Sequence, residues 1–119
     1  MVLTDTSVWV DHLRIGNNKV EFLLEHGLVL IHPFVTGELA CGNLKNRKQF
    51  LADLTLLPSA MLATHDEVLY LIEQQKLWGK GLGWADIHLL ASARLSGCKL
   101  WTLDLRLAKS ANDLGVSYL

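Results

Sequence analysis

The sequence predicts an α/β fold in which helices cover both faces of a mainly parallel, five-stranded sheet. Short runs of apolar and β-branched residues alternate along the chain with longer segments of helical periodicity. Gly97 and Gly115 stand at the ends of helical segments and directly before the last two apolar runs. Alternation of this kind is typical of a three-layer α/β/α sandwich, in which the chemistry lies beyond the carboxyl ends of the strands.

Five segments are predicted as strands, and the third of them has the weakest β signal. They are residues 2–4, 28–31, 60–63, 100–103 and 116–119.

Seven segments between these strands have helical patterns. They are residues 7–13, 19–25, 33–40, 46–57, 65–76, 84–95 and 105–111. Pro33 suits the first turn of its helix, and Thr64 with Glu67 forms a capping box. The chain has no repeat and no Pro/Gly/Ser-rich linker, so residues 1–119 are predicted to form one domain.

Composition excludes several classes of protein. Hydrophobic residues make up 50% of the chain, which suggests a buried oligomer or partner surface. No apolar run approaches about 18 residues, so no membrane span is predicted. The N-terminus has no basic region or cleavage site, so we expect a cytoplasmic protein. Cys41 and Cys98 match no zinc pattern and are expected to be reduced, buried thiols.

Three aspartates occupy unusual positions. Asp5 and Asp104 each end an apolar strand and precede a helix, where an acid serves either as an N-cap or as a functional group. Asp86 shares a helical stripe with Leu89, Leu90 and Ala93. A carboxylate on a buried stripe is costly unless something compensates its charge.

Glu38 is the fourth acid, and it shares a helical face with Phe34, Val35 and Cys41. All four acids fall where the chain leaves a strand or begins the next helix, so they are expected to meet at one edge of the sheet. Clustered carboxylates repel one another, and Mg²⁺ or Mn²⁺ relieves that repulsion at an all-oxygen site. Thr6, Ser7 and Thr102 can supply supporting hydroxyls.

Charge is consistent with such a site. Eleven Lys and Arg face twelve Asp and Glu, and the formal net charge is −1. With four acids engaged at a metal, the other side chains carry a net charge of about +3, which suits a polyanionic partner.

Four motifs in order resemble the PIN domain and, more narrowly, the small VapC-type toxins of prokaryotic toxin–antitoxin pairs. They are DTSVW, the PxxTxEL pattern of residues 33–39, the GLGWAD of residues 81–86 and the TLD of residues 102–104. The resemblance covers the whole chain. It implies a strand order of 3-2-1-4-5 and a Mg²⁺-dependent endoribonuclease whose acids are Asp5, Glu38, Asp86 and Asp104. It also implies a homodimer, neutralised by a small antitoxin that is usually encoded beside it.

Basic residues are candidates for RNA contacts. Many relatives continue the last motif with a further acid and an aromatic residue, where this chain has Arg106 and Leu107. A fifth carboxylate is therefore absent there, and Arg106 is a candidate to approach a phosphate. Lys45, Arg47 and Lys48 form a basic cluster that suits either RNA or a solvated helix end.

Histidines and tryptophans are assigned no catalytic role. The five histidines form no spaced ligand set and are expected on helix surfaces or in loops. The four tryptophans are expected in the core or at a dimer contact rather than as platforms for bases.

Other functions fit less well. A haloacid-dehalogenase-type domain needs DxDx[TV], but Asp5 is followed by Thr6 and Ser7. A receiver domain needs an acceptor Asp and a late Lys that this pattern lacks. The remaining alternative is a catalytically inactive PIN-like module that binds RNA or protein, against which the presence of all four acids argues.

Overall fold

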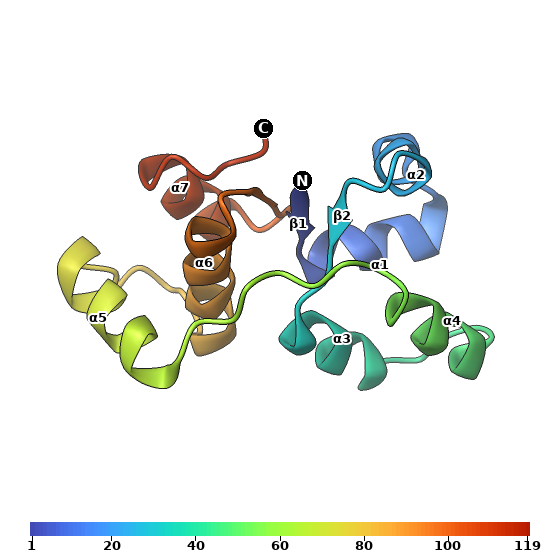
Figure 1. Cartoon of the computed structure of the whole chain (residues 1–119), viewed down its shortest axis with the longest axis horizontal. Helices are drawn as coiled ribbons and strands as arrows, with labels where there is room; N and C mark the ends of the chain where they lie inside the picture. Colours follow the sequence, from blue (N-terminus) through green and yellow to red (C-terminus); the bar gives the residue numbers. More distant parts are fainter.

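Three short parallel strands form the centre of the protein. The computed structural model describes residues 1–119. Strand β1 (Val2–Thr4) lies between β2 (Val29–Leu30) and β3 (Lys99–Trp101), so the sheet order is β2-β1-β3 (Figure 1). Leu3 is paired with Leu30 on one side and with Leu100 on the other. Because both pairings are parallel, the carboxyl ends of β1 and β3 face the same edge.

The outer two predicted strands are not formed as strands. Each edge of the sheet instead carries a single parallel bridge, Ile31 with Ser59 and Leu100 with Ser117. At the first edge the chain leaves the sheet at once, because the N–H of Met61 bonds to the hydroxyl of Ser96 on a helix. The bridges place these segments at the outer positions of the order 3-2-1-4-5, but the five-stranded sheet itself is not found.

All seven predicted helices are present, with ends displaced by up to three residues. Their bounds are α1 Thr6–Ile15, α2 Asn18–Glu25, α3 Pro33–Ala40, α4 Arg47–Leu54, α5 His65–Gln75, α6 Trp84–Ser96 and α7 Leu105–Asp113. The capping box predicted from Thr64 and Glu67 opens α5. Gly97 ends α6 with a φ of 62°, a left-handed conformation that glycine adopts at little cost.

The helices gather in two groups on either side of the strands. In Figure 1, α5, α6 and α7 lie to the left, and α1 to α4 lie to the right. Helices α6 and α7 pack against β3, α5 packs against α6, and α1 packs against α3. One hydrophobic cluster joins the elements, and its fully buried members include Leu3, Leu89, Leu90, Leu100 and Leu107.

Two expectations from the sequence concerned membrane spans and cysteines. No helix is both long and apolar enough to cross a membrane. Cys41 and Cys98 are both free thiols, and Cys98 is buried as expected. The expectation of a buried Cys41 was wrong: this residue is exposed because it lies at the C-terminal end of α3, beyond the part of the helix that packs.

Candidate active site

Three of the four acids lie where helices begin at one edge of the sheet. Asp5 follows β1 and is the N-cap of α1, while Asp104 follows β3 and is the N-cap of α7. Asp86 is the third residue of α6, a helix that packs against β3. The partial positive charge of a helix N-terminus favours a carboxylate at each of these positions.

Asp5 is the buried acid of the group, with 7% of its surface exposed. Its Oδ1 accepts a bond of 2.7 Å from the N–H of Thr6. Its Oδ2 accepts hydrogen bonds from the hydroxyls of Ser7 (2.9 Å) and Thr102 (2.7 Å). Asp5 therefore caps a helix and is also held by two side chains from different parts of the chain.

The two hydroxyls that hold Asp5 are themselves oriented by the backbone. Ser7 Oγ accepts from the N–H of Leu103 at 3.0 Å, and Thr102 Oγ1 accepts from the N–H of Asp104 at 3.0 Å. Each hydroxyl has only one proton, which it donates to Asp5. Ser7 and Thr102 therefore fix the Asp5 carboxylate and connect it to the turn that carries Asp104.

Asp104 and Asp86 each use one carboxylate oxygen for their helix. The N–H groups of Arg106 (2.9 Å) and Leu107 (3.1 Å) bond to Oδ1 of Asp104. The N–H of Gly83 bonds to Oδ2 of Asp86 at 2.8 Å. These bonds leave the second oxygen of each carboxylate free for a ligand.

Asp86 experiences the charges of the other two aspartates. Burial raises the pKa of Asp86 above its ordinary value, the bond from Gly83 opposes that rise, and the charges of Asp5 and Asp104 add to it. The stripe predicted beneath it is buried, since Leu89, Leu90 and Ala93 are each 1% exposed or less. The structure thus brings Asp5, Asp86 and Asp104 into one electrostatic group.

Glu38 joins this group through a hydroxyl. Its Oε1 accepts a hydrogen bond of 2.7 Å from Thr6, the first residue of α1. The expected buried stripe around Glu38 was wrong in part, because Glu38 is exposed and Val35 and Leu39 are the residues of α3 that face the core. An exposed carboxylate needs no compensation for burial, so the contact with Thr6 is what connects Glu38 to the site.

The donor set has the chemistry of a hard-cation site. Carboxylates and hydroxyls supply only oxygen ligands, which suit Mg²⁺ or Mn²⁺. Both neighbours whose charges raise the pKa of Asp86 are acids. In this structure, however, no three His, Cys, Asp or Glu side chains lie close enough together to ligate a single ion. The residues fit such a cation by chemistry, and ligation requires the carboxylates to approach one another.

Arg106 lies over the loop that leads to Asp86. A Cβ placed on Gly81 would lie 2.6 Å from Nη1 and 2.8 Å from Cδ of Arg106, so a larger residue there would displace the arginine side chain from its present position. Gly81 also has a φ of +74°. The sequence pattern did not reveal this contact, which places the Arg106 side chain against the loop that precedes Asp86.

The predicted basic cluster is divided in the structure. Arg47 donates to the carbonyls of Gly42 (3.1 Å) and Ala40, so its guanidinium satisfies the C-terminal end of α3. Lys45 lines a groove that also contains Glu38. Lys48 is exposed on α4. The arginine is therefore engaged in structure, while the two lysines remain candidates for RNA.

A row of aromatic and imidazole rings connects α3, α5 and α6. His88 lies edge-on to both Phe34 (4.6 Å between centroids) and Trp84 (4.8 Å), and His65 of α5 contacts Trp84 at 5.0 Å. His32 contacts Phe34 at 5.1 Å. Phe34 lies on α3 and Trp84 and His88 lie on α6, the helices that carry Glu38 and Asp86, whereas His65 lies on α5 and His32 directly precedes α3. Sequence patterns gave no signal for the row beyond its apolar surroundings.

Two histidines of this row were expected at the surface, and that expectation was wrong. His32 is 1% exposed and His88 is 8% exposed. His32 Nδ1 accepts from the N–H of Phe34 at 3.0 Å and so caps α3, while its Nε2 is buried without a partner. Burial, with a smaller contribution from His88, lowers the pKa of His32 to about 4. Burial, and then His65, lowers the pKa of His88.

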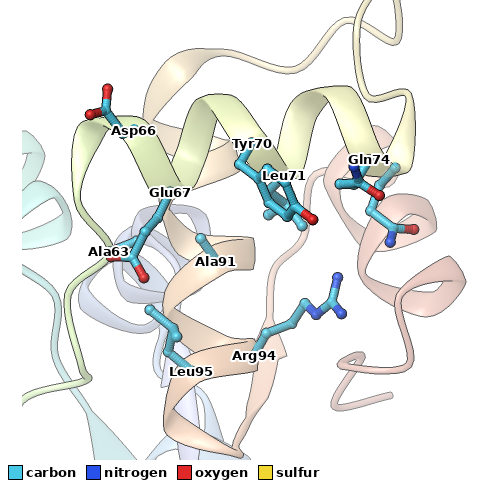
Figure 2. Close-up of a pocket in the computed structure, with 10 residues that line it drawn as sticks. Ala63, Asp66, Glu67, Tyr70, Leu71, Gln74, Ala91, Arg94 and Leu95 are labelled. Atoms are coloured by element: carbon cyan, nitrogen blue, oxygen red, sulfur yellow. The ribbon is translucent and has the colours of Figure 1, made fainter.

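Two cavities lie outside the group of aspartates. One, of about 600 Å³, opens between α5 and α6, and Figure 2 shows Tyr70, Leu71, Arg94 and Leu95 among its lining side chains. The other, of about 530 Å³, runs from Glu38 past Val10 and Leu13 of α1 to Phe50. The second cavity is continuous with the candidate site, whereas the first contains none of the four acids.

Comparison with known proteins agrees with these features. The PIN domain model matches residues 2–112. The chain is 43% identical over 118 residues to Ribonuclease VapC32 of Mycobacterium tuberculosis strains CDC 1551 and H37Rv. The aligned residues cover 98% of this chain and 95% of each relative. No solved structure matches significantly. The matched range contains all four acids, the three hydroxyls that support them and the sheet that positions them. The chain therefore belongs to the PIN domain family, among its VapC-type members.

Proposed function

We propose that this protein is a metal-dependent endoribonuclease that acts as the toxin of a toxin–antitoxin pair. The observation that carries the proposal is the placement of Asp5, Asp86 and Asp104 at the N-terminal ends of three helices at one edge of the sheet, where the charges of Asp5 and Asp104 act on Asp86. Groups whose pKa values are shifted by burial and by neighbouring charges gather at functional sites. The printed name of the M. tuberculosis relatives, a ribonuclease, supports RNA as the substrate.

The aspartates would hold one or two Mg²⁺ or Mn²⁺ ions, with Glu38 completing the site. A divalent cation bound there would lower the pKa of an attacking water and stabilise charge on the scissile phosphate. Ser7 and Thr102 keep Asp5 in one orientation, and Thr6 orients Glu38 toward the same edge. Hydrolysis would leave a 5′-phosphate, which gains the oxygen of water, and a 3′-hydroxyl.

Basic residues around the site would attract the RNA. Arg106 lies against Gly81 in the loop that leads to Asp86, and Lys45 lies in the groove that contains Glu38. Their charges would offset the negative charge of the phosphates near the acids. The cognate antitoxin implied by the family resemblance would be a VapB-like protein, and a homodimer is the expected assembly.

Incubation of the purified protein with total RNA tests the activity. Cleavage is expected with Mg²⁺ or Mn²⁺ and is expected to stop in EDTA, and mapped ends should carry 5′-phosphates. Full cleavage in EDTA, or 2′,3′-cyclic phosphate ends, would contradict a metal-dependent hydrolysis.

A catalytically inactive PIN-like binding module is the second candidate. It is favoured by one observation, that no three acidic side chains are close enough here to ligate one ion. The same experiment separates the two functions, because a binding module would retain RNA or a protein partner without cutting RNA at any metal concentration.

A further inference from the structure

We propose that Phe34 and Trp84 form a platform on which bases of single-stranded RNA stack beside the cleavage site. The inference rests on the proposed ribonuclease function and adds a subsite to it. Its subject is the row of rings, which we call the aromatic row, made of His32, Phe34, His65, Trp84 and His88.

The position of the two rings relative to the acids is the first argument. Phe34 lies four residues before Glu38 on α3, so the two side chains share a face of that helix. Trp84 is the first residue of α6 and Asp86 is the third. Trp84 and Asp86 therefore lie on different sides of the first turn of α6, and the ring of Trp84 is linked to that of Phe34 through His88. An RNA strand with one phosphate at the acids would place a neighbouring nucleotide over these rings.

Exposure is the second argument. Phe34 is 36% exposed and Trp84 is 39% exposed, although each contacts neighbouring rings within the protein. Trp9 and Trp101, by contrast, are 2% and 3% exposed and belong to the core. Phe34 and Trp84 are thus partly packed and partly exposed. Such partial exposure is expected of a side chain that presents one apolar face to a ligand.

Rigidity is the third argument. His88 is 8% exposed and lies at steep angles of 62° to Phe34 and 77° to Trp84, so it fixes the orientation of both rings. His65 of α5 contacts Trp84, and the buried His32 contacts Phe34 edge-on. Rings that are already fixed lose little conformational entropy when a base stacks on them.

Stacking suits this substrate better than a protein contact does. Every base has a π-face, so a pair of fixed rings binds single strands with little sequence preference. The free carboxylates beside the row would repel an unshielded polyanion, and stacking supplies binding energy that does not depend on charge. A docked protein would need a larger apolar surface than these two rings provide.

Binding of RNA with and without bases tests the platform directly. The protein carries Asp86→Asn to prevent cleavage, EDTA is present, and the probes are single-stranded oligoadenylate of about eight nucleotides and an abasic ribose-phosphate oligomer of equal length. We expect the intact RNA to bind about tenfold or more tightly than the abasic oligomer. Trp84→Leu and Phe34→Leu should each reduce that preference several-fold while leaving the affinity for the abasic oligomer unchanged.

Matched controls exclude a general loss of structure. Trp78 is 58% exposed and lies outside the aromatic row, and Phe22 is 54% exposed on α2. Trp78→Leu and Phe22→Leu should retain the full preference for bases. Intrinsic tryptophan fluorescence gives a second measurement, because bound RNA should quench the fluorescence of Trp84. The Trp84→Leu variant should lose this part of the quenching, whereas Trp78→Leu should keep it.

The outcomes separate this inference from the proposed function. The platform would be overturned if Trp84→Leu and Phe34→Leu prefer intact over abasic RNA as strongly as the two control variants do. This holds even if the wild-type protein cuts RNA. A second outcome is that the wild type shows no metal-dependent cleavage while only Trp84→Leu and Phe34→Leu lose the preference for intact RNA. This outcome would overturn the ribonuclease function and support the platform.

Discussion

Asp86 is the residue whose removal should affect catalysis most directly. We expect Asp86→Asn to lower the rate of RNA cleavage by orders of magnitude, because the amide cannot supply an anionic ligand to a cation. Asp53→Asn is the matched control, because Asp53 is exposed and its carboxylate accepts a hydrogen bond only from Gln49 on its own helix. Cleavage rates of the two variants under identical Mg²⁺ concentrations provide the measurement. Equal rates in the two would contradict the assigned site.

His32 should make stability depend on pH below neutrality. Its folded-state pKa is about 4, against 6.5 for the unfolded residue, so the unfolded chain binds more protons between these values. The free energy of unfolding should therefore fall as pH drops through 6.5 toward 4, by at most about 3 kcal/mol. His32→Asn retains a good N-cap and should lose much of this dependence.

Denaturant unfolding between pH 7 and pH 4 measures the effect. His26 is exposed, so His26→Asn is the control and should keep the wild-type dependence. A pH dependence that is the same in both variants would show that His32 does not titrate abnormally.

The loop between α5 and α6 lies against the side chain of Arg106 at Gly81. Gly81 and Gly79 have φ values of +74° and +70°, so alanine should cost roughly 1–2 kcal/mol of stability at either position. Only at Gly81 would the new Cβ collide with Arg106, since nothing lies within 4 Å of a Cβ at Gly79. We expect comparable losses in melting temperature, but weaker RNA binding in Gly81→Ala alone.

A double variant shows whether Arg106 mediates this effect. In an Arg106→Ala background, Gly81→Ala should weaken RNA binding no further, because the displaced side chain is already absent. Additive losses in the double variant would mean that the loop acts on RNA by another route.

The group of acids should make the stability of the whole molecule depend on metal. The folded-state pKa of Asp86 lies above its unfolded value, so the folded metal-free protein binds more protons, and stability falls as pH rises through the unfolded and then the folded pKa. Mg²⁺ should restore stability by binding the native state alone. Asp86→Asn removes one repelling charge and should melt above the metal-free wild type.

Thermal melts in EDTA and in Mg²⁺ test this prediction. A difference of about 1 kcal/mol corresponds to roughly 4 °C or more in a domain near this size. Mg²⁺ should raise the melting temperature of the wild type and have little effect on Asp86→Asn. Melts of the wild type that are identical in EDTA and Mg²⁺ would contradict a metal site among these acids.

Self-association is expected of the intact chain. Large apolar side chains remain exposed over several elements, including Ile15 (71%), Leu56 (81%) and Leu105 (86%). Burying such surface between two copies is favourable. Sedimentation equilibrium at tens of micromolar should therefore show a dimer, and a monomer at that concentration would contradict the prediction.

Local patterns in the sequence were sufficient to predict the seven helices and to place Asp5, Asp86 and Asp104 at or near their N-terminal ends. Periodicity and capping residues act within a few positions of each other, so Pro33, the Thr64–Glu67 box and Gly97 predicted helix ends without knowledge of the fold. The convergence of Asp5 and Asp104 followed from the parallel arrangement alone. The catalytic roles of the four acids remain predictions.

Burial and edge pairing were decided only by the tertiary structure. Whether Glu38 faces the core depends on which side of α3 meets α1, and whether His32 and His88 are covered depends on how α3 and α6 approach each other. The outer segments form single bridges because competing contacts, such as that of Met61 with Ser96, are made by residues distant in sequence. Such contacts between distant residues leave no periodic signal in the chain, whereas helix formation and capping do.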